Sequence, residues 1–99
     1  MHVLILEDEI PAYEKLKAYI SECFDDNLDI TWLKSVKEGL TYFSKEPRID
    51  LIISDIELLD GTSFSLFEKI DISTPIIFCT AYDQYLLKAF KTKNVKNLS

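Results

Sequence analysis

The sequence has few of the residues that break or cross-link a chain, with two glycines, three prolines and two cysteines among its 99 residues. This composition excludes a collagen-like or low-complexity protein. Cys23 and Cys79 are too few and too far apart for a CxxC metal or redox site, and each falls within an apolar pattern. We therefore predict two buried, reduced thiols.

Long hydrophobic runs are also missing. Nowhere do about 18 consecutive apolar residues occur, which is roughly the length needed to span a bilayer. The amino terminus opens with a strand-like run and not with a basic segment followed by a long apolar stretch. We expect a cytoplasmic protein with no membrane partner.

Positive charge is scarce, because 11 basic side chains face 17 acidic ones and leave a net charge of -6. Such a balance repels nucleic acid unless a local basic patch overrides it. The last dozen residues hold the one candidate patch, formed by Lys88, Lys91, Lys93 and Lys96 without an intervening acid. No arginine or glycine-rich context supports a binding role, so we interpret it as a solvated face and expect no direct nucleic-acid binding.

Hydrophobic residues make up 47% of the chain, which is enough for a compact core in a single domain covering residues 1–99. Four short apolar runs predict strands, at residues 3–6, 28–33, 51–53 and 75–79. The second run alternates with polar residues, as expected of a strand at a sheet edge. Apolar residues at three- and four-residue spacing predict helices over 11–23, 36–43, 64–70 and 82–90.

The boundaries of these segments carry their own signals. Ser35 followed by Glu38 matches a capping box at the start of the second helix, and Asp60-Gly61 predicts a turn before the third. Residues 95–98 begin a further apolar run. Regular alternation of strand and helix predicts an α/β protein with a doubly wound parallel sheet and helices on both faces. The carboxyl ends of its strands then lie along one edge, where ligands bind in such folds.

Three predicted strands end on polar residues at that edge: Glu7 and Asp8 after the first, Asp55 after the third and Thr80 after the fourth. Clustered carboxylates repel one another unless a cation lies among them, and an all-oxygen site suits Mg²⁺. Each residue also has a simpler interpretation. The acidic triplet that ends with Glu9 fits a solvated turn or the amino terminus of a helix, Asp55 fits a turn, and Thr80 fits a β-branched strand residue.

The stretches VLILEDE, LIISDIELLDG and PIIFCTAYDQYLLKAF, in this order, resemble the three successive signatures of response-regulator receiver domains. The last stretch is most similar to receivers that precede LytTR-type DNA-binding domains. The resemblance covers essentially the whole chain. By analogy with the family it implies a flavodoxin-like sheet with strand order 2-1-3-4-5.

Carried over residue by residue, the resemblance implies that Asp55 is the phosphoacceptor and that Glu7, Asp8 and Asp55 hold Mg²⁺. Glu57, two residues after the acceptor, would add its backbone carbonyl as a ligand. A carboxylate is a competent nucleophile toward an activated phosphoryl group when a metal neutralises the developing charge.

The resemblance also assigns the residues that respond to the phosphoryl group. Thr80 would be the switch hydroxyl that moves to hydrogen-bond a phosphoryl oxygen, and Ala81 the small neighbour that leaves room for it. Two positions depart from the family pattern. Leu59 stands where many receivers have proline, and the family's lysine after the fifth strand would fall one residue beyond Ser99. Lys96 lies four positions too early to replace it.

The family's last helix has no counterpart here either, so we expect a C-terminally truncated receiver with a partial fifth strand. An apolar face of the sheet would then be covered by a partner or by a second copy, as a homodimer or by domain exchange.

The function implied is that of a receiver that takes a phosphoryl group from a sensor histidine kinase and controls a DNA-binding, transcriptional output. It is not an enzyme beyond its own phosphorylation and dephosphorylation. Two alternatives stay open. One is a pseudo-receiver that binds partners without phosphorylation. The other is a Mg²⁺-dependent phosphohydrolase with Asp55 as nucleophile, although Glu57 stands where that class usually has a general-acid aspartate.

Overall fold

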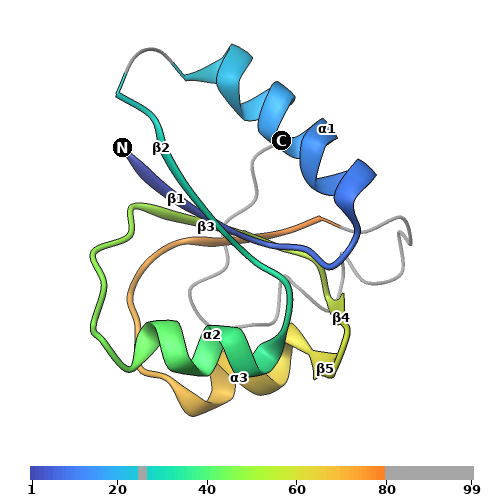
Figure 1. The fold of residues 1–99 in the computed structure, drawn as a ribbon. Helices are drawn as coiled ribbons and strands as arrows, with labels where there is room; N and C mark the ends of the chain where they lie inside the picture. Colours follow the sequence, from blue (N-terminus) through green and yellow to red (C-terminus); the bar gives the residue numbers. More distant parts are fainter. Residues whose placement is uncertain (25–26, 80–99) are drawn as a thin grey trace.

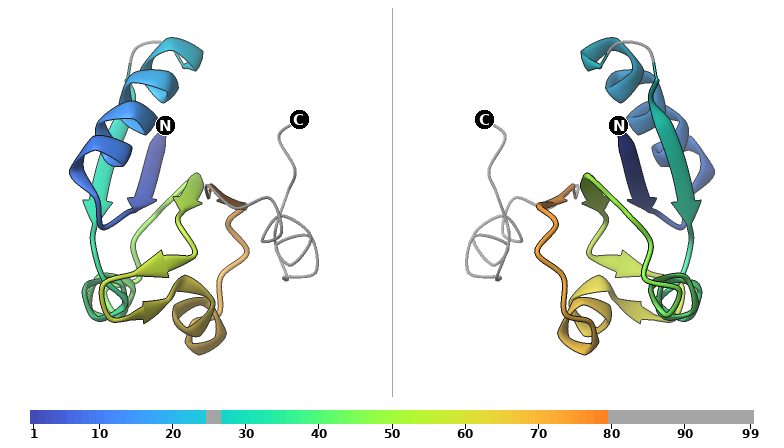
Figure 2. Two further views of the ribbon diagram at one scale, coloured as in Figure 1. Left: turned by 90° about the vertical axis from the view of Figure 1, so that its right-hand side faces the viewer. Right: turned by 90° about the vertical axis from the view of Figure 1, so that its left-hand side faces the viewer.

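The computed structural model describes residues 1–24 and 27–79. A four-stranded parallel sheet forms its centre, in the order β2-β1-β3-β6. The strands are β1 (His2–Leu6), β2 (Asp29–Leu33), β3 (Leu51–Ser54) and β6 (Ile76–Phe78). Figure 2 shows them side by side from two directions. All four strands were predicted, and their order confirms the doubly wound, flavodoxin-like fold over the described residues.

The helices cover both faces of the sheet, as predicted. They are α1 (Ile10–Cys23), α2 (Val36–Phe43) and α3 (Ser63–Lys69). In Figure 1, α1 lies on one side of the sheet and α2 and α3 lie on the other. The helix predicted over residues 82–90 and the strand over 95–98 lie outside the described residues.

Two hydrophobic clusters fill the space between the layers, because successive strand residues point to opposite faces. In β1, Val3 and Ile5 pack toward α1, while Leu4 and Leu6 pack toward α2 and α3. All four side chains are fully buried. This burial on both faces explains why β1 reads as an unbroken apolar run.

Side chains from two different loops bind the amino terminus of α2. Ser35 Oγ accepts the Glu38 N–H at 3.0 Å, while Glu38 Oε1 accepts the N–H of Lys34 at 2.8 Å. The Asp60 carboxylate accepts the N–H groups of Val36 and Lys37, at 2.7 and 3.0 Å. These two donors lower the pKa of Asp60 below its ordinary value.

The turn predicted at Asp60-Gly61 is part of a short hairpin that sequence patterns did not reveal. Its strands, β4 (Glu57–Leu58) and β5 (Gly61–Thr62), are antiparallel. Gly61 has φ 146°, a conformation that side-chain-bearing residues rarely adopt. The hairpin holds Asp60 against α2 and so ties the segment after β3 to the neighbouring helix.

The prediction of two buried thiols was wrong for Cys23, which is exposed at the end of α1. Ile20, one turn earlier, is the buried residue of this helix. Cys79 is half-buried, and both thiols are free.

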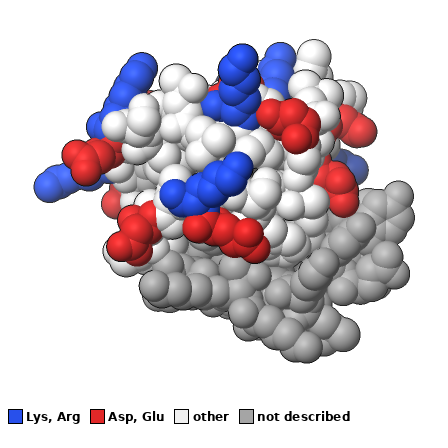
Figure 3. Space-filling view, turned by 90° about the horizontal axis from the view of Figure 1, so that it is seen from below, with Lys and Arg blue, Asp and Glu red and all other residues white. Residues whose placement is uncertain are grey.

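No helix in the described part of the chain is long and apolar enough to cross a membrane. On the face of the molecule seen in Figure 3, acidic and basic side chains are interspersed.

At Gly39, α2 packs closely against Leu66 of α3. A Cβ atom built on Gly39 would lie 2.6 Å from Cδ2 of Leu66, a fully buried side chain. Helix propensity favours alanine over glycine by about 1 kcal/mol, but overpacking a filled core costs about 1–3 kcal/mol. We therefore expect Gly39→Ala to lower the free energy of unfolding by about 1 kcal/mol in urea titrations.

The same substitution should become neutral or stabilising in a Leu66→Val background, which lacks the clashing atom. Equal effects of Gly39→Ala in both backgrounds would show that the contact with Leu66 is not the cause.

Candidate functional site

Glu7, Asp8 and Asp55 meet at the carboxyl ends of β1 and β3. The two strands pair in parallel with Leu6 opposite Ser54, so the residues that follow each strand emerge side by side. One carboxylate oxygen from each acid lies within 4.8 Å of the others. In Figure 1 both strands end on the same side, beside β4. The structure thus brings together three of the acids predicted from the sequence.

Main-chain hydrogen bonds hold both strand ends in place. The Glu7 N–H donates to the Leu33 carbonyl at 3.0 Å, and the Asp55 N–H donates to the Leu6 carbonyl at 2.8 Å. The Ser54 hydroxyl donates to the Asp55 carbonyl at 2.8 Å. Asp55 therefore continues the sheet by one residue before the chain turns. This fixes the backbone position from which the Asp55 side chain extends.

The carboxylates carry their own local partners. Asp55 Oδ1 accepts the N–H of Ile56 at 2.7 Å, and Glu7 Oε2 accepts the N–H of Glu9 at 3.1 Å. Glu9 is the N-cap residue of α1, in agreement with its predicted position at a helix amino terminus. Its side chain makes no capping hydrogen bond.

Burial makes this cluster electrostatically unfavourable for negative charge. Glu7 is 6% exposed, and desolvation, followed by the nearby charge of Asp55, raises its pKa to about 7. Desolvation also raises the pKa of Asp55, although the N–H groups of Ile56 and Glu57 oppose this. In the free protein, burial therefore shifts Glu7 and Asp55 toward their protonated forms.

The donor set fits a hard divalent cation. Three carboxylate oxygens from two adjacent strand ends form an all-oxygen site, which suits Mg²⁺ and leaves further positions for water or phosphate oxygens. A bound cation would also offset the repulsion that raises the pKa values of Glu7 and Asp55.

The structure describes only some of the remaining residues that the sequence singled out. Glu57 begins β4, and its side chain is exposed, so any contribution to the site would come from its backbone. Thr80 and Ala81, together with Lys96, lie outside the described residues. Leu59 is 72% exposed in the hairpin turn.

Two neighbours of the site were not recognised from the sequence as such. The Trp32 indole N–H donates to the Glu7 carbonyl at 2.7 Å. The Cys79 thiol has a raised pKa, first because it is buried and then because Asp55 and Glu7 are near. The sequence carries no direct signal for the Trp32 contact, because it depends on the register of β1 and β2, in which Trp32 lies opposite Ile5.

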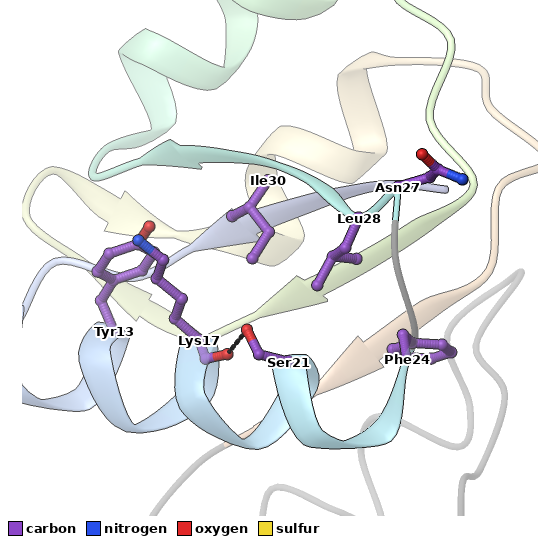
Figure 4. A pocket seen from close by; sticks show the side chains of 7 residues that line it. All are labelled: Tyr13, Lys17, Ser21, Phe24, Asn27, Leu28 and Ile30. Atoms are coloured by element: carbon purple, nitrogen blue, oxygen red, sulfur yellow. Dashed lines mark hydrogen bonds between the residues drawn. The ribbon is translucent and has the colours of Figure 1, made fainter.

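A separate groove of about 470 Å³ lies between α1 and the segment that leads into β2. It is lined by Tyr13, Lys17, Ser21, Phe24, Asn27, Leu28 and Ile30 (Figure 4). None of the three clustered acids lines it, so the groove and the acidic site are separate features.

Solved structures with a similar fold are receivers. The response regulator TrrA of Thermotoga maritima, solved in complex with Mg²⁺-BeF, is 27% identical with a TM-score of 0.72; the match covers 98% of this chain and 87% of that one. The non-phosphorylated HemR receiver domain of Leptospira biflexa is 26% identical with a TM-score of 0.66, over 95% and 77% of the two chains. Fold and similarity together define a response-regulator receiver domain.

Curated sequences narrow the class further. The sensory transduction protein LytT of Enterococcus faecalis is 37% identical over 94 residues, and LytR of Streptococcus agalactiae is 32% identical over 99 residues. These matches cover 92% and 96% of this chain but 38% and 40% of the relatives. No protein-family profile matches the chain. The chain belongs to the receiver domains of response regulators and is similar in sequence to the LytT and LytR proteins.

The raised pKa of Glu7 has a measurable consequence for stability without a metal ion. Protonation of Glu7 contributes to the stability of the folded state. This contribution is fully present below pH 4.5, the ordinary pKa, and is lost as the pH rises through about 7. Glu7→Gln removes the charge that must be buried. We therefore expect it to raise the melting temperature above pH 7, with a gain that shrinks toward pH 4.5.

Adding Mg²⁺ should reverse this order by stabilising the wild type more than Glu7→Gln, as measured by thermal melting. Glu9→Gln, which changes an exposed acid two residues away, serves as the matched control. It should melt like the wild type across this pH range and respond to Mg²⁺ like the wild type. An equal Mg²⁺ response of wild type and Glu7→Gln would contradict a role for Glu7 in the site.

Proposed function

We propose that this chain accepts a phosphoryl group on Asp55 as the receiver of a two-component system. The meeting of Glu7, Asp8 and Asp55 within 4.8 Å at the carboxyl edge of the sheet carries the proposal. The TrrA structure supports it, because that receiver is described in complex with Mg²⁺-BeF.

Asp55 has the features of the acceptor. Its backbone is fixed by hydrogen bonds to Leu6 and Ser54, and Ile56 holds one carboxylate oxygen. A carboxylate oxygen of Asp55 attacks the phosphorus of the donor as the bond from phosphorus to the donor atom breaks. The leaving group keeps that electron pair, and an aspartyl phosphate results.

Glu7 and Asp8 would hold Mg²⁺ together with Asp55, and the Glu57 backbone carbonyl would complete the protein ligands. The metal supplies charge neutralisation at the phosphoryl oxygens during transfer. The raised pKa of Glu7 implies that this residue releases a proton when the site is loaded.

The wider roles follow from the family. We propose a sensor histidine kinase as the donor, Thr80 as the switch hydroxyl with Ala81 beside it, and a DNA-binding, transcriptional output under LytTR-type control in the cytoplasm. Residues 1–99 would form the receiver, and we propose that it assembles as a homodimer or by domain exchange. Phosphorylation adds a charge of about -1.5 to -2 at Asp55, which alters the surface offered to partners.

Incubation with Mg²⁺ and acetyl phosphate, followed by intact mass measurement, tests the proposal. We expect the mass of one phosphoryl group to be added to the wild type and none to Asp55→Asn. Asp71→Asn, at an exposed position outside the site, should be phosphorylated like the wild type.

The alternatives give different results in the same assay. A folded wild type that binds Mg²⁺ but gains no phosphoryl group would indicate a pseudo-receiver. Rapid release of many equivalents of phosphate from monoesters would indicate a phosphohydrolase. Phosphorylation that survives Asp55→Asn would place the acceptor elsewhere.

A further inference from the structure

Trp32 lies beside the acidic site and holds its backbone. Both main-chain polar groups of Glu7 bond to β2: the N–H donates to the Leu33 carbonyl, and the carbonyl accepts the Trp32 indole N–H at 2.7 Å. The peptide that joins Glu7 to Asp8 therefore has one fixed orientation. That peptide sets the directions in which the two carboxylates leave the chain.

The indole ring is itself held in place. It stacks on the Tyr13 ring of α1, with centroids 3.8 Å apart and planes 1° from parallel. The Lys34 ammonium lies 4.6 Å from the indole centroid, within cation–π distance. A buried indole N–H usually finds an acceptor, and here the acceptor is the carbonyl of a site residue.

We propose that Trp32 is a positioning residue for the metal ligands, a role that rests on the proposed function. By fixing the Glu7 carbonyl, it preorganises Glu7 and Asp8 for a cation shared with Asp55, much as outer-shell partners orient ligands in other metal sites. It also links α1, through Tyr13, to the site. Without the indole N–H the peptide between Glu7 and Asp8 would be free to rotate, and cation binding would have to order it.

Trp32→Phe tests this role, because phenylalanine keeps an aromatic ring on β2 but removes the donor. We expect the Mg²⁺ concentration for half-maximal phosphorylation of Asp55 by acetyl phosphate to rise about 3- to 10-fold, the scale of one lost hydrogen bond. The maximal rate at saturating Mg²⁺ should stay near that of the wild type. Tyr13→Phe, which keeps the stacked ring, is the matched control and should leave both values unchanged.

A second measurement needs no substitution. Trp32 is the single tryptophan, so its indole N–H gives one assignable resonance in a ¹⁵N-labelled chain. We expect this resonance to shift during a Mg²⁺ titration with the same midpoint as the Asp55 amide. This result would stand even if Trp32→Phe failed to fold.

Several results would overturn the proposal. They are an indole resonance that does not move at saturating Mg²⁺, a half-maximal Mg²⁺ concentration unchanged in folded Trp32→Phe, or a loss of maximal rate alone. Failure of the proposed function looks different: the wild type would gain no phosphoryl group, while the Mg²⁺ titration would still decide the role of Trp32. A wild type without any Mg²⁺ response would overturn both.

Discussion

Glu7, Asp8 and Asp55 meet because β1 and β3 pair in parallel with Leu6 opposite Ser54. The run from Val3 to Leu6 is apolar and fully buried, and Glu7 follows it directly. A slip of one residue would carry a carboxylate into the core in place of Leu6, which disfavours other registers. The same apolar residues that form the core thus determine which acids share the site.

Two carboxylates of this protein show opposite responses to their surroundings. Asp60 is exposed and accepts two main-chain N–H groups at the start of α2, so its pKa is lowered and its charge supports the fold. Glu7 is buried beside Asp55, so its pKa is raised and its charge opposes the fold. An arrangement that costs stability in the free protein is common at sites built to bind a ligand. The burial of Glu7 beside Asp55 is therefore best explained by a cation that the two carboxylates would bind.

The sequence predicted the sheet well because each strand is a short apolar run followed by polar residues, and the spacing of apolar residues in α1 and α2 is regular. It also predicted that Glu7, Asp8 and Asp55 converge, since parallel strands end at one edge. It did not predict the β4–β5 hairpin, whose strands of two residues are too short for any periodicity. Nor did it predict the bond from Trp32 to Glu7, which depends on the register between β1 and β2 and on a side-chain rotamer.

The central claim is that the three acids form one divalent-cation site. Crystals of the chain grown with Mn²⁺, measured near the manganese absorption edge, would locate the ion directly by its anomalous scattering. We predict one strong peak, about 2 Å from carboxylate oxygens of Glu7, Asp8 and Asp55, as expected for a small hard cation. A peak that is absent from this edge of the sheet, or that contacts the exposed acids elsewhere instead, would contradict the claim.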